Sequence, residues 1–384
     1  MMRTMRSVYL DYNATTPIAP EVLAAMMPYL GDEFGNPSSG HALGRRARAA
    51  IDDARSEVAR LIGAEPDEIV FTSGGTEANN LAIAGVMRAV ATRRHVVTST
   101  IEHPATVEPC KELARRGCAV TWVAVDDAAQ VDAEAVAAIV RDDTALVSIM
   151  HSNNEVGTLQ PIAAIARAGH ARGALVHTDA AQSIGKVPID VRELGVDLLS
   201  IAGHKLHAPK GVGALYVRRG IPIAPVVRGA SHERGLRPGT ENVASIVALG
   251  RACGLAHDGI AGADRVRMLR DRLWNRLRAA AAEIALNGHA TDRLPNTLSV
   301  RFPRVRGTAL LARVEDEIFA STGSACHDGR ESPSSVLRAM GLDDDAALGT
   351  VRISLGRATT EQDVDTAAEA LTREWIALAD DDAR

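Results

Sequence analysis

The sequence is poor in aromatic residues. Phenylalanine, tyrosine and tryptophan together make up only 3% of the 384 residues. Because hydrophobic residues still account for 46% of the chain, the core must be built mainly from Ala, Val, Leu and Ile. A chain of this length and apolar content is long enough for two domains, or for one large α/β domain with an appendage. We expect an ordinary globular protein.

Features that would indicate other protein classes are missing. No window approaches the roughly 20 apolar residues of a membrane span, and the first residues, MMRTMRS, lack the apolar stretch of a secretory signal. A net charge of −5, with both signs mixed along the chain, gives no support for nucleic-acid binding. We therefore expect a cytoplasmic protein with no membrane or nucleic-acid partner.

Cysteine is also scarce. The four cysteines are Cys110, Cys118, Cys253 and Cys326. They show neither metal-ligand spacing nor the density of a disulfide scaffold, so we expect no metal site and a reducing compartment. Cys326 differs from the others because it lies among small residues in STGSACHDGR (321–330), whereas a structural cysteine usually packs in an apolar run.

Short apolar runs alternate with helical patterns in the first part of the chain. The runs are 68–73, 95–100, 119–125, 145–150, 174–179, 197–203 and 213–219. Most are near-continuously apolar, as expected of strands buried on both faces of a mostly parallel sheet. Helical segments such as 77–90 and 162–173 lie between them. This alternation predicts a wound α/β domain.

The pattern changes from about residue 240. A long helical stretch that includes 264–284 is followed by the strand-like segments 296–302 and 351–356 and by a closing helix. This change indicates a second, smaller α+β domain.

Polar residues follow four of the predicted strands. They are Glu102 and His103, the segment HSNNEVG (151–157), Asp179, and His204 with Lys205. In open α/β sheets, ligands bind beyond the carboxyl ends of the strands. Four such coincidences indicate one shared site.

The segment TSGGTEANN (72–80) lies between a predicted strand and a predicted helix. Its backbone N–H groups, the helix N-terminus and the Thr76 hydroxyl would form an anion cradle. It lacks the lysine of a P-loop and the glycine pattern of a dinucleotide fold, which favours a single phosphate over a nucleotide. The alternative is a plain strand-to-helix turn with a threonine cap.

Lys205 directly follows an apolar strand. Partial desolvation there would lower the pKa of its amine, which is the condition for forming a Schiff base. Asp179, at a neighbouring strand end, could keep a pyridine nitrogen protonated. The alternatives are a lysine that extends to solvent and an aspartate that caps a helix. Together, the cradle, Asp179 and Lys205 indicate pyridoxal 5'-phosphate.

Four further residues suit such a site. His103 could stack on the cofactor, or it could only start a helix before Pro104. Asn154 and Gln182 could bond the ring oxygen, or satisfy local turns. Arg352 suits bidentate capture of a substrate carboxylate, and its alternative is a surface arginine on an edge strand.

The chain resembles the cysteine desulfurases, pyridoxal phosphate enzymes of fold type I in the class V aminotransferase group. Ten ordered motifs carry this resemblance along nearly the whole chain. They are YLDYNATTP (9–17), GNPSS (35–39), FTSGGTEANNLAI (71–83), EHPA (102–105), NNEVGTLQPI (153–162), HTDAAQSIGK (177–186), GHKLHAPKGVGALYVRRG (203–220), HERGLRPGTENV (232–243), TGSAC (322–326) and VRISLGRATT (351–360).

The resemblance implies a fold type I transferase: an α/β fold with a mostly parallel central sheet and a smaller α+β domain. Residues 14–260 would form the large cofactor-binding domain. Residues 1–13 and 261–384 would form the small domain, which carries the catalytic cysteine loop. The protein would be a homodimer.

The resemblance also implies the roles of individual residues. Lys205 would bind the cofactor covalently and shuttle the Cα proton, Asp179 would pair with the pyridinium, and His103 would stack. The phosphate would be held by Gly75, Thr76, His204 and the partner subunit's Thr240. Asn154 and Gln182 would line the ring, and Asn154 would also face the substrate. Arg352, with Asn36, would bind the substrate carboxylate.

The implied reaction converts L-cysteine to L-alanine and leaves a persulfide on Cys326. A sulfur-acceptor protein, such as an iron–sulfur scaffold, would then receive the sulfur for iron–sulfur clusters or other thio-compounds. A loop of small residues would let the Cys326 thiol travel between substrate and acceptor.

Two features depart from the common desulfurase pattern. Ala202 replaces a phosphate-binding serine, and HDGRESPSSVL (327–337) replaces the usual small residues after Cys326. The second segment is similar to selenocysteine lyases, so release of selenium from L-selenocysteine is the alternative function. His327 could lower the pKa of the Cys326 thiol, or it could only face water. An aminotransferase, which needs no thiol, and a cofactor-binding scaffold without catalysis are further alternatives.

Overall fold

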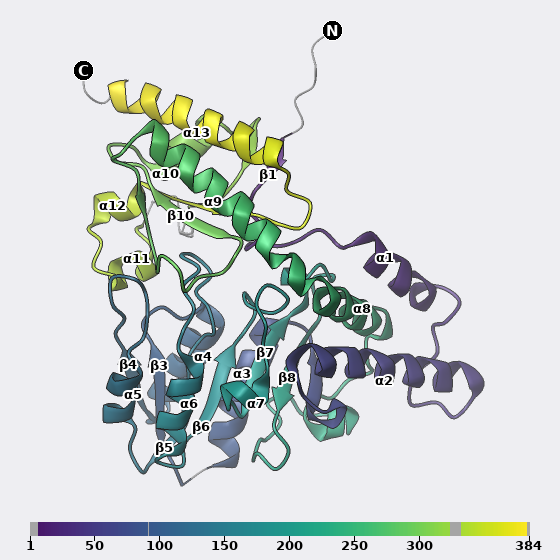
Figure 1. Ribbon diagram of the computed structural model, residues 1–384. Helices are drawn as coiled ribbons and strands as arrows, with labels where there is room; N and C mark the ends of the chain where they lie inside the picture. Colours follow the sequence, from purple (N-terminus) through teal and green to yellow (C-terminus); the bar gives the residue numbers. More distant parts are fainter. Residues whose placement is uncertain (1–6, 91, 323–331, 382–384) are drawn as a thin grey trace.

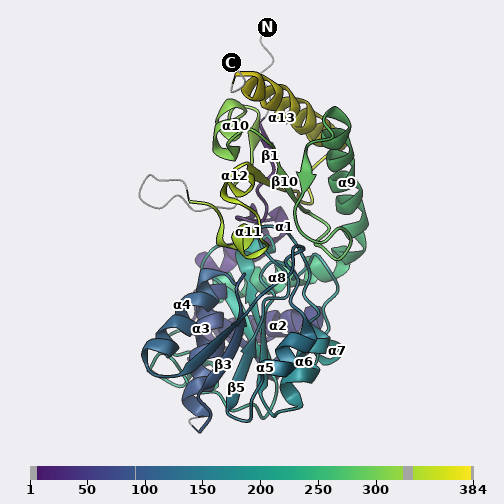
Figure 2. The same ribbon diagram turned by 90° about the vertical axis from the view of Figure 1, so that its left-hand side faces the viewer.

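The computed structural model describes residues 7–90, 92–322 and 332–381. Two units are stacked on one another, a larger one around a seven-stranded sheet and a smaller one around a three-stranded sheet (Figure 1). Both ends of the described chain lie in the smaller unit, where β1 (Val8–Tyr9) and α13 (Glu361–Asp381) are neighbours in Figures 1 and 2.

The large sheet has the strand order β2-β8-β7-β6-β5-β3-β4. Its strands are β2 (Ile69–Thr72), β3 (His95–Ser99), β4 (Ala119–Val123), β5 (Thr144–Ser148), β6 (Leu175–Asp179), β7 (Leu198–Ala202) and β8 (Gly213–Val217). All neighbouring strands are parallel except that β8 runs antiparallel to both β7 and β2. The prediction of a mostly parallel sheet is therefore confirmed.

Helices cover both faces of this sheet. The larger unit contains α1 (Pro20–Met26), α2 (Ala42–Ile62), α3 (Gly75–Ala89), α4 (Pro104–Arg115), α5 (Ala133–Ile139), α6 (Ile162–His170), α7 (Val191–Leu194) and α8 (Val243–Gly259). Short 3-10 turns are η1 (Met27–Leu30), η2 (Pro66–Glu68), η3 (Gly203–Lys205), η4 (His232–Gly235) and η5 (Ile260–Gly262).

Alternate residues of the strands belong to two different cores. Val96 and Leu198 pack in the core that contains α3, whereas Val97 and Leu199 pack in the core that contains α2, α6 and α8. Because side chains alternate between the faces of a sheet, a strand that is covered on both faces must be apolar throughout. This explains the near-continuous apolar runs in the sequence.

The smaller unit is antiparallel, with strand order β12-β10-β9. Its elements are β9 (Ala285–Leu286), β10 (Thr297–Arg301), β12 (Thr350–Ser354), α9 (Ala263–Ala280), α10 (Gly307–Arg313), α11 (Ser335–Ala339), α12 (Asp344–Leu348) and α13. The strand β1 pairs in parallel with β11 (Ile318–Phe319). One core joins α9, α13 and the sheet through residues such as Leu273, Phe302 and Leu371.

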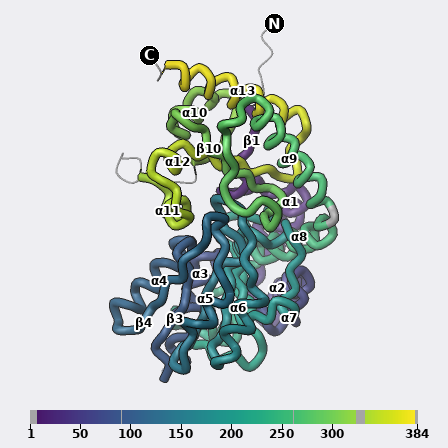
Figure 3. Tube along the Cα trace, turned by 60° about the vertical axis from the view of Figure 1, so that its left-hand side comes forward, coloured from purple at the N-terminus to yellow at the C-terminus, as the bar shows by residue number. Residues whose placement is uncertain are grey.

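The two units also share a small core. Val336 and Leu337 of α11 pack with Ile101 and Met150, which follow β3 and β5 in the larger unit. The tube view shows α11 resting against the top of the larger unit (Figure 3). This contact brings the smaller unit against the edge at which the parallel strands end.

The strand and helix predictions agree with the structure. The seven predicted apolar runs correspond to β2 to β8, and 296–302 and 351–356 correspond to β10 and β12. The helix expected at 77–90 begins at Gly75, and that at 264–284 corresponds to α9. The division into 14–260 and 1–13 with 261–384 stays a proposal. Within the described residues, no helix is long and apolar enough to cross a membrane.

Candidate active site

Asp179 and Lys205 lie at the same edge of the large sheet. Asp179 is the last residue of β6, and Lys205 ends η3, the turn that directly follows β7. Because β6 and β7 are parallel neighbours, their carboxyl ends meet at one edge. The sequence therefore places a carboxylate and an amine side by side.

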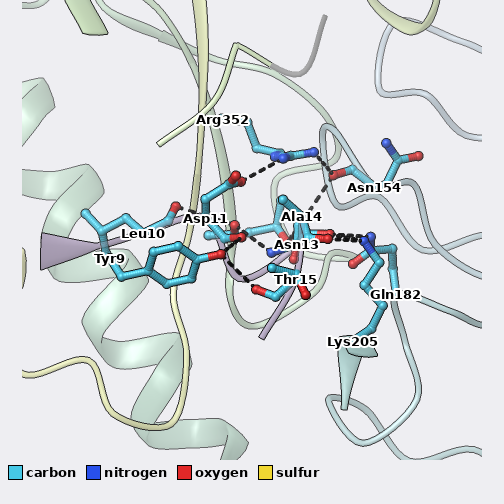
Figure 4. A network of polar contacts seen from close by, with 12 residues as sticks. Tyr9, Leu10, Asp11, Asn13, Ala14, Thr15, Asn154, Gln182, Lys205 and Arg352 are labelled. Atoms are coloured by element: carbon cyan, nitrogen blue, oxygen red, sulfur yellow. Dashed lines mark hydrogen bonds and ion pairs between the residues drawn. The ribbon is translucent and has the colours of Figure 1, made fainter. Parts of the chain in front are cut away.

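The Lys205 amine is held by the N-terminal segment of the chain. Its Nζ donates to the carbonyl oxygens of Asn13 at 2.5 Å and Ala14 at 2.9 Å (Figure 4). Desolvation lowers the pKa of Lys205 to about 8, with a further lowering by Arg352 and an opposing effect of Asp11 and Asp179. The amine therefore loses its proton far more readily than an ordinary lysine, as a nucleophilic lysine requires.

The Asp179 carboxylate is buried and precisely oriented. It accepts hydrogen bonds from Asn79 Nδ2 at 2.6 Å and from the Ala181 N–H at 2.9 Å. The bond to Ala181 lies in a turn, because no helix follows β6 before α7, so the alternative role of Asp179 as a helix cap is wrong. Asn79, a buried residue of α3, adds a tertiary contact that a simple cap does not need.

His103 begins α4 and lies at a cavity wall. Its Nδ1 accepts the Ala105 N–H at 3.1 Å, so the helix-start role is present. Desolvation and Lys205 lower the pKa of His103, while Asp179 opposes them. The ring is exposed and lines the same hollow as Thr76. A neutral exposed ring is suited to stacking.

The N-terminus of α3 has the form of an anion cradle. Its cap residue, Gly74, has φ 147° and provides no side-chain hydrogen bond, so the N–H groups of the first turn are not capped. A Cβ added at Gly75 would lie 3.3 Å from the Ala202 methyl group. Ala202 therefore packs directly beside the cradle, where a serine would add a hydroxyl.

His204 adds a neutral donor or acceptor near this cradle. Its Nδ1 lies 3.2 Å from Thr15 Oγ1, and its carbonyl oxygen accepts from the Thr16 N–H and hydroxyl. Desolvation lowers the pKa of His204 to about 4, with Lys205 contributing in the same direction. The imidazole is therefore neutral at pH 7 and can offer hydrogen bonds but no charge.

Arg352 is buried rather than a surface residue. Its Nη2 pairs with Asp11 Oδ1 at 2.8 Å, and its Nη1 donates to the Asn154 carbonyl at 3.2 Å (Figure 4). Its Nε is buried without a hydrogen-bond partner among the described residues. A buried guanidinium with an unused donor fits a place for a carboxylate.

Gln182 and Asn154 both contact Asn13. Gln182 Nε2 donates to the Asn13 carbonyl at 3.0 Å, and the Asn154 carbonyl accepts from Asn13 Nδ2 at 3.2 Å. Asn154 thus joins the hydrogen-bond network through its backbone carbonyl. The structure brings both residues to the network around Lys205.

Two predicted residues have no contact with this network. Asn36 is exposed, and its Oδ1 accepts the Ser38 N–H at 2.9 Å in a turn before α2. Thr240 is exposed between η4 and α8, beside the buried Glu241, which pairs with Arg48. Cys326 and His327 lie outside the described residues.

The other cysteines do not suit catalysis. Burial raises the pKa of the Cys110 thiol to about 12 and raises that of Cys253 as well. Cys118 is partly exposed and borders the hollow between α3 and α4. Within the described part of the chain, no group of histidine, cysteine and acidic residues could hold a metal ion.

The sequence reasoning missed four residues of this site: Asp11, Asn13, Asn79 and Lys186. The motif YLDYNATTP contained two of them, but nothing in the local pattern assigned them a task. The signal for Lys186 is composition, because the chain has only four lysines against 39 arginines. Lys111 and Lys210 are exposed, whereas Lys205 and Lys186 belong to the network.

Glu102 is a buried carboxyl group beside the site. Its Oε1 accepts from Ser99 Oγ at 2.5 Å and from the Met150 N–H at 3.0 Å, but Oε2 has no partner among the described residues. Desolvation raises the pKa of Glu102 to about 8, and Asp179 adds to the rise. The folded state therefore favours the protonated form.

We expect this group to make stability pH-dependent. The pKa of Glu102 is about 8 in the folded state, and its ordinary value is 4.5. The protonated carboxyl group therefore contributes fully to the free energy of unfolding below pH 4.5, and this contribution is lost as the pH rises to about 8. Glu102→Gln imitates the protonated form. Its melting temperature relative to wild type should rise by on the order of a few degrees between pH 5 and pH 8, measured by calorimetry.

The control for this prediction is Glu108→Gln. Glu108 is exposed on α4 and pairs with Lys111. The difference in melting temperature between Glu108→Gln and wild type should not change in this way between pH 5 and pH 8. If the melting temperatures of Glu102→Gln and wild type change in parallel with pH, Glu102 is already ionised in the folded state.

Comparisons with known proteins agree with one another. The family model described as Aminotransferase class-V matches residues 8–366. The protein named cysteine desulfurase 2 from Trichormus variabilis (strain ATCC 29413 / PCC 7937) is 46% identical over 362 residues, which are 94% of this chain and 91% of the relative.

The chain is also similar to solved structures. A NifS-like protein has a TM-score of 0.90 and 38% identity, covering 96% of this chain and 99% of its own. A structure described as SspA in complex with cysteine has a TM-score of 0.81 and 36% identity, covering 91% of this chain and 99% of its own. The similarity thus extends over nearly the full length of each chain.

Proposed function

The chain belongs to the aminotransferase class-V family, and on this premise we propose that it is a pyridoxal phosphate-dependent cysteine desulfurase. It converts L-cysteine to L-alanine and transfers the sulfur atom to Cys326 as a persulfide. The observation that carries the proposal is the Lys205 amine, which has a pKa lowered to about 8 by desolvation and interacts with both Asp179 and Arg352.

The residues present fit pyridoxal 5'-phosphate. The uncapped first turn of α3, with Gly75 and Thr76, suits the phosphate, and His204 offers it a neutral hydrogen-bond group. The buried Asp179 suits a protonated ring nitrogen, and His103 suits the face of the ring. When bound, the cofactor supplies an electron sink for the carbon adjacent to the amino group.

Asn154, Gln182 and the partner subunit's Thr240 complete the proposed cofactor site. Gln182 presents its Nε2 on the side of the Asn13 carbonyl, which also accepts from Lys205. Ala202 leaves one hydroxyl contact to the phosphate unfilled, so the remaining donors of the cradle must suffice.

The chain's own groups bind and orient the substrate and move its protons. Arg352 binds the carboxylate of L-cysteine, with Asn36 as a proposed helper, and its buried position excludes water from that contact. Lys205 takes the proton from Cα and returns it. Between these events the carbonyls of Asn13 and Ala14 hold its amine.

Cys326 accepts the sulfur. Its thiolate attacks the sulfur of the substrate, the carbon–sulfur bond breaks, and a proton completes the methyl group of alanine. L-cysteine and one Cys326 thiol thus give L-alanine and one Cys326 persulfide, with no external oxidant or reductant. The persulfide then passes to a sulfur-acceptor protein, such as an iron–sulfur scaffold, or supplies other thio-compounds.

L-cysteine is favoured over L-selenocysteine as the substrate. The related protein of Trichormus variabilis carries a desulfurase name, and the structure of SspA is described as a complex with cysteine. In the segment 327–337, which suggested the selenocysteine lyase alternative, residues 327–331 lie outside the described residues.

We also propose a homodimer in the cytoplasm. The support for the dimer is an apolar strip on α1, η1 and the residues beside them. Its exposed side chains are Ile18, Leu23, Met27, Leu30 and Phe34. Large exposed apolar side chains gathered in one segment are typical of a protein interface. A reducing compartment would keep Cys326 available as a thiol.

The direct test is the reaction of the purified protein with L-cysteine. We expect alanine to form and the Cys326 peptide to gain the mass of one sulfur atom, measured by mass spectrometry without reductant. Cys326→Ala should lose this modified peptide, while Cys118→Ala should keep it. Alanine formation with sulfide release unchanged in Cys326→Ala would contradict the acceptor role.

The same assay separates the alternatives. A much larger kcat/KM for L-selenocysteine than for L-cysteine would identify a selenocysteine lyase. Pyruvate with pyridoxamine phosphate in place of alanine would identify an aminotransferase. Absence of a visible cofactor band in the purified protein would indicate a scaffold without catalysis.

A further inference from the structure

Lys186 lies in the interior of the site and has no acidic partner among the residues that the structure describes. Its Nζ donates to Asn13 Oδ1 at 3.1 Å and to Gln182 Oε1 at 3.2 Å. It borders a cavity of about 440 Å³ between the two units, which Lys205 also lines. Burying a cationic group without a carboxylate is costly, so its presence calls for a function.

The Gln182 amide has only one orientation that satisfies its neighbours. Its oxygen accepts from the Lys186 amine, and its nitrogen faces the Asn13 carbonyl, which can only accept. If the amide turned by 180°, its nitrogen would face the Lys186 amine, donor against donor. Its oxygen would face the Asn13 carbonyl, acceptor against acceptor. The two contacts together fix the amide.

The Asn13 amide is fixed in the same way. Its Oδ1 accepts from Lys186 and from Asn296 Nδ2 at 3.0 Å, and its Nδ2 donates to Thr297 Oγ1 at 2.9 Å. Thr297 in turn donates its hydroxyl hydrogen to Asn296 Oδ1 at 3.1 Å. Asn13 Nδ2 also donates to the Asn154 carbonyl at 3.2 Å, so the network has a single consistent assignment of donors and acceptors, in which Lys186 is the donor shared by both amide oxygens.

The carbonyl of Asn13 joins this network to Lys205. It accepts from Gln182 Nε2 at 3.0 Å and from Lys205 Nζ at 2.5 Å. The side of Gln182 that carries the nitrogen therefore faces the place of the Lys205 amine. A nitrogen presented there can donate to an oxygen of a bound ring, whereas an oxygen would repel it.

We infer that Lys186 is a positioning residue for the desulfurase site: its two hydrogen bonds fix the amides of Asn13 and Gln182, so that Gln182 presents an N–H donor to the cofactor. The inference rests on the proposed function, because it needs the pyridine ring to lie beside Gln182. Lys186 does not touch the substrate; it acts through Gln182.

The test is the visible spectrum of the protein with bound cofactor. A donor to the ring oxygen favours its anionic form, so loss of the fixed donor should raise the pH midpoint of the visible absorption change. In Lys186→Met we expect a rise of about one pH unit and a cofactor dissociation constant that is about tenfold higher, measured by titration of the cofactor-free protein.

Three variants control the test. Lys186→Arg has only donors, and the adjacent cavity leaves room for its longer side chain, so its midpoint should return toward that of wild type. Lys210→Met removes an exposed lysine close in sequence to Lys205 and should leave the midpoint unchanged. Lys186→Leu, which also has no hydrogen-bond donor, serves where Lys186→Met does not fold.

The failures of the two proposals are distinguishable. A wild-type protein that takes up no pyridoxal phosphate would overturn the proposed function. A wild-type protein with a normal band, whose midpoint and cofactor affinity do not change in a folded Lys186→Met or Lys186→Leu variant, would overturn the role of Lys186 alone.

Discussion

Lys205→Ala should abolish desulfuration, lowering turnover of L-cysteine by more than about 10³-fold. The amine is the group that takes and returns the Cα proton, and no second lysine can reach the same place because Lys186 is held on Asn13 and Gln182. We expect the variant to fold, since Gln182 still donates to the Asn13 carbonyl that Lys205 leaves.

The measurement is alanine formation together with covalent attachment of the cofactor. After borohydride reduction and denaturation, wild type should retain the cofactor on the peptide that contains Lys205, and Lys205→Ala should not. Lys111→Ala, an exposed residue of α4, is the matched control. Retention of the cofactor by the Lys205 variant would assign the covalent link to another residue.

Arg352→Ala is expected to lower kcat/KM for L-cysteine on the order of 10²-fold, mainly through KM. The variant removes a buried guanidinium whose Nε has no partner among the described residues. Asp11 also loses its partner, but its side chain is 20% exposed, so water can solvate the carboxylate. The loss should therefore fall on substrate binding rather than on folding.

Two further variants serve as controls for the Arg352→Ala prediction. Arg352→Lys keeps the charge without the planar fork and should recover only part of the loss. Arg357→Ala removes an exposed arginine of the same segment, which pairs with Glu21, and should leave KM unchanged. If KM for L-cysteine stays at the wild-type value in Arg352→Ala, another group binds the carboxylate.

Local sequence patterns predicted the elements of the large sheet because its strands are covered on both faces. A run such as 197–203 is apolar throughout and is followed by polar residues, so both β7 and the place of Lys205 could be located. The alternative for His103 proved compatible with the site, since His103 makes the expected capping bond of α4, whereas the residues after Asp179 form turns and no helix. Capping and a functional position do not exclude one another.

The remaining parts of the site depend on contacts between distant residues. Nothing near Lys205 in the sequence indicates that Asn13, 192 positions away, provides its acceptor. Likewise, Arg352 looks like an edge-strand residue until Asp11 is placed against it. Lys186 lies in the turns that follow β6, and its distance from carboxylates among the described residues is visible only in three dimensions. Such pairings are set by tertiary packing, and the local periodicity of apolar residues does not predict them.

The pairing of Asp11 with Arg352 also has a consequence for synthesis of the protein. The two residues are 341 positions apart, so Asp11 leaves the ribosome long before Arg352 is synthesised. The large sheet can form while translation continues. The catalytic centre cannot, because the segment around Asp11 and β12 meet only after β12 has emerged. A prematurely ended chain is therefore inactive by construction, whatever the quality of its folded sheet.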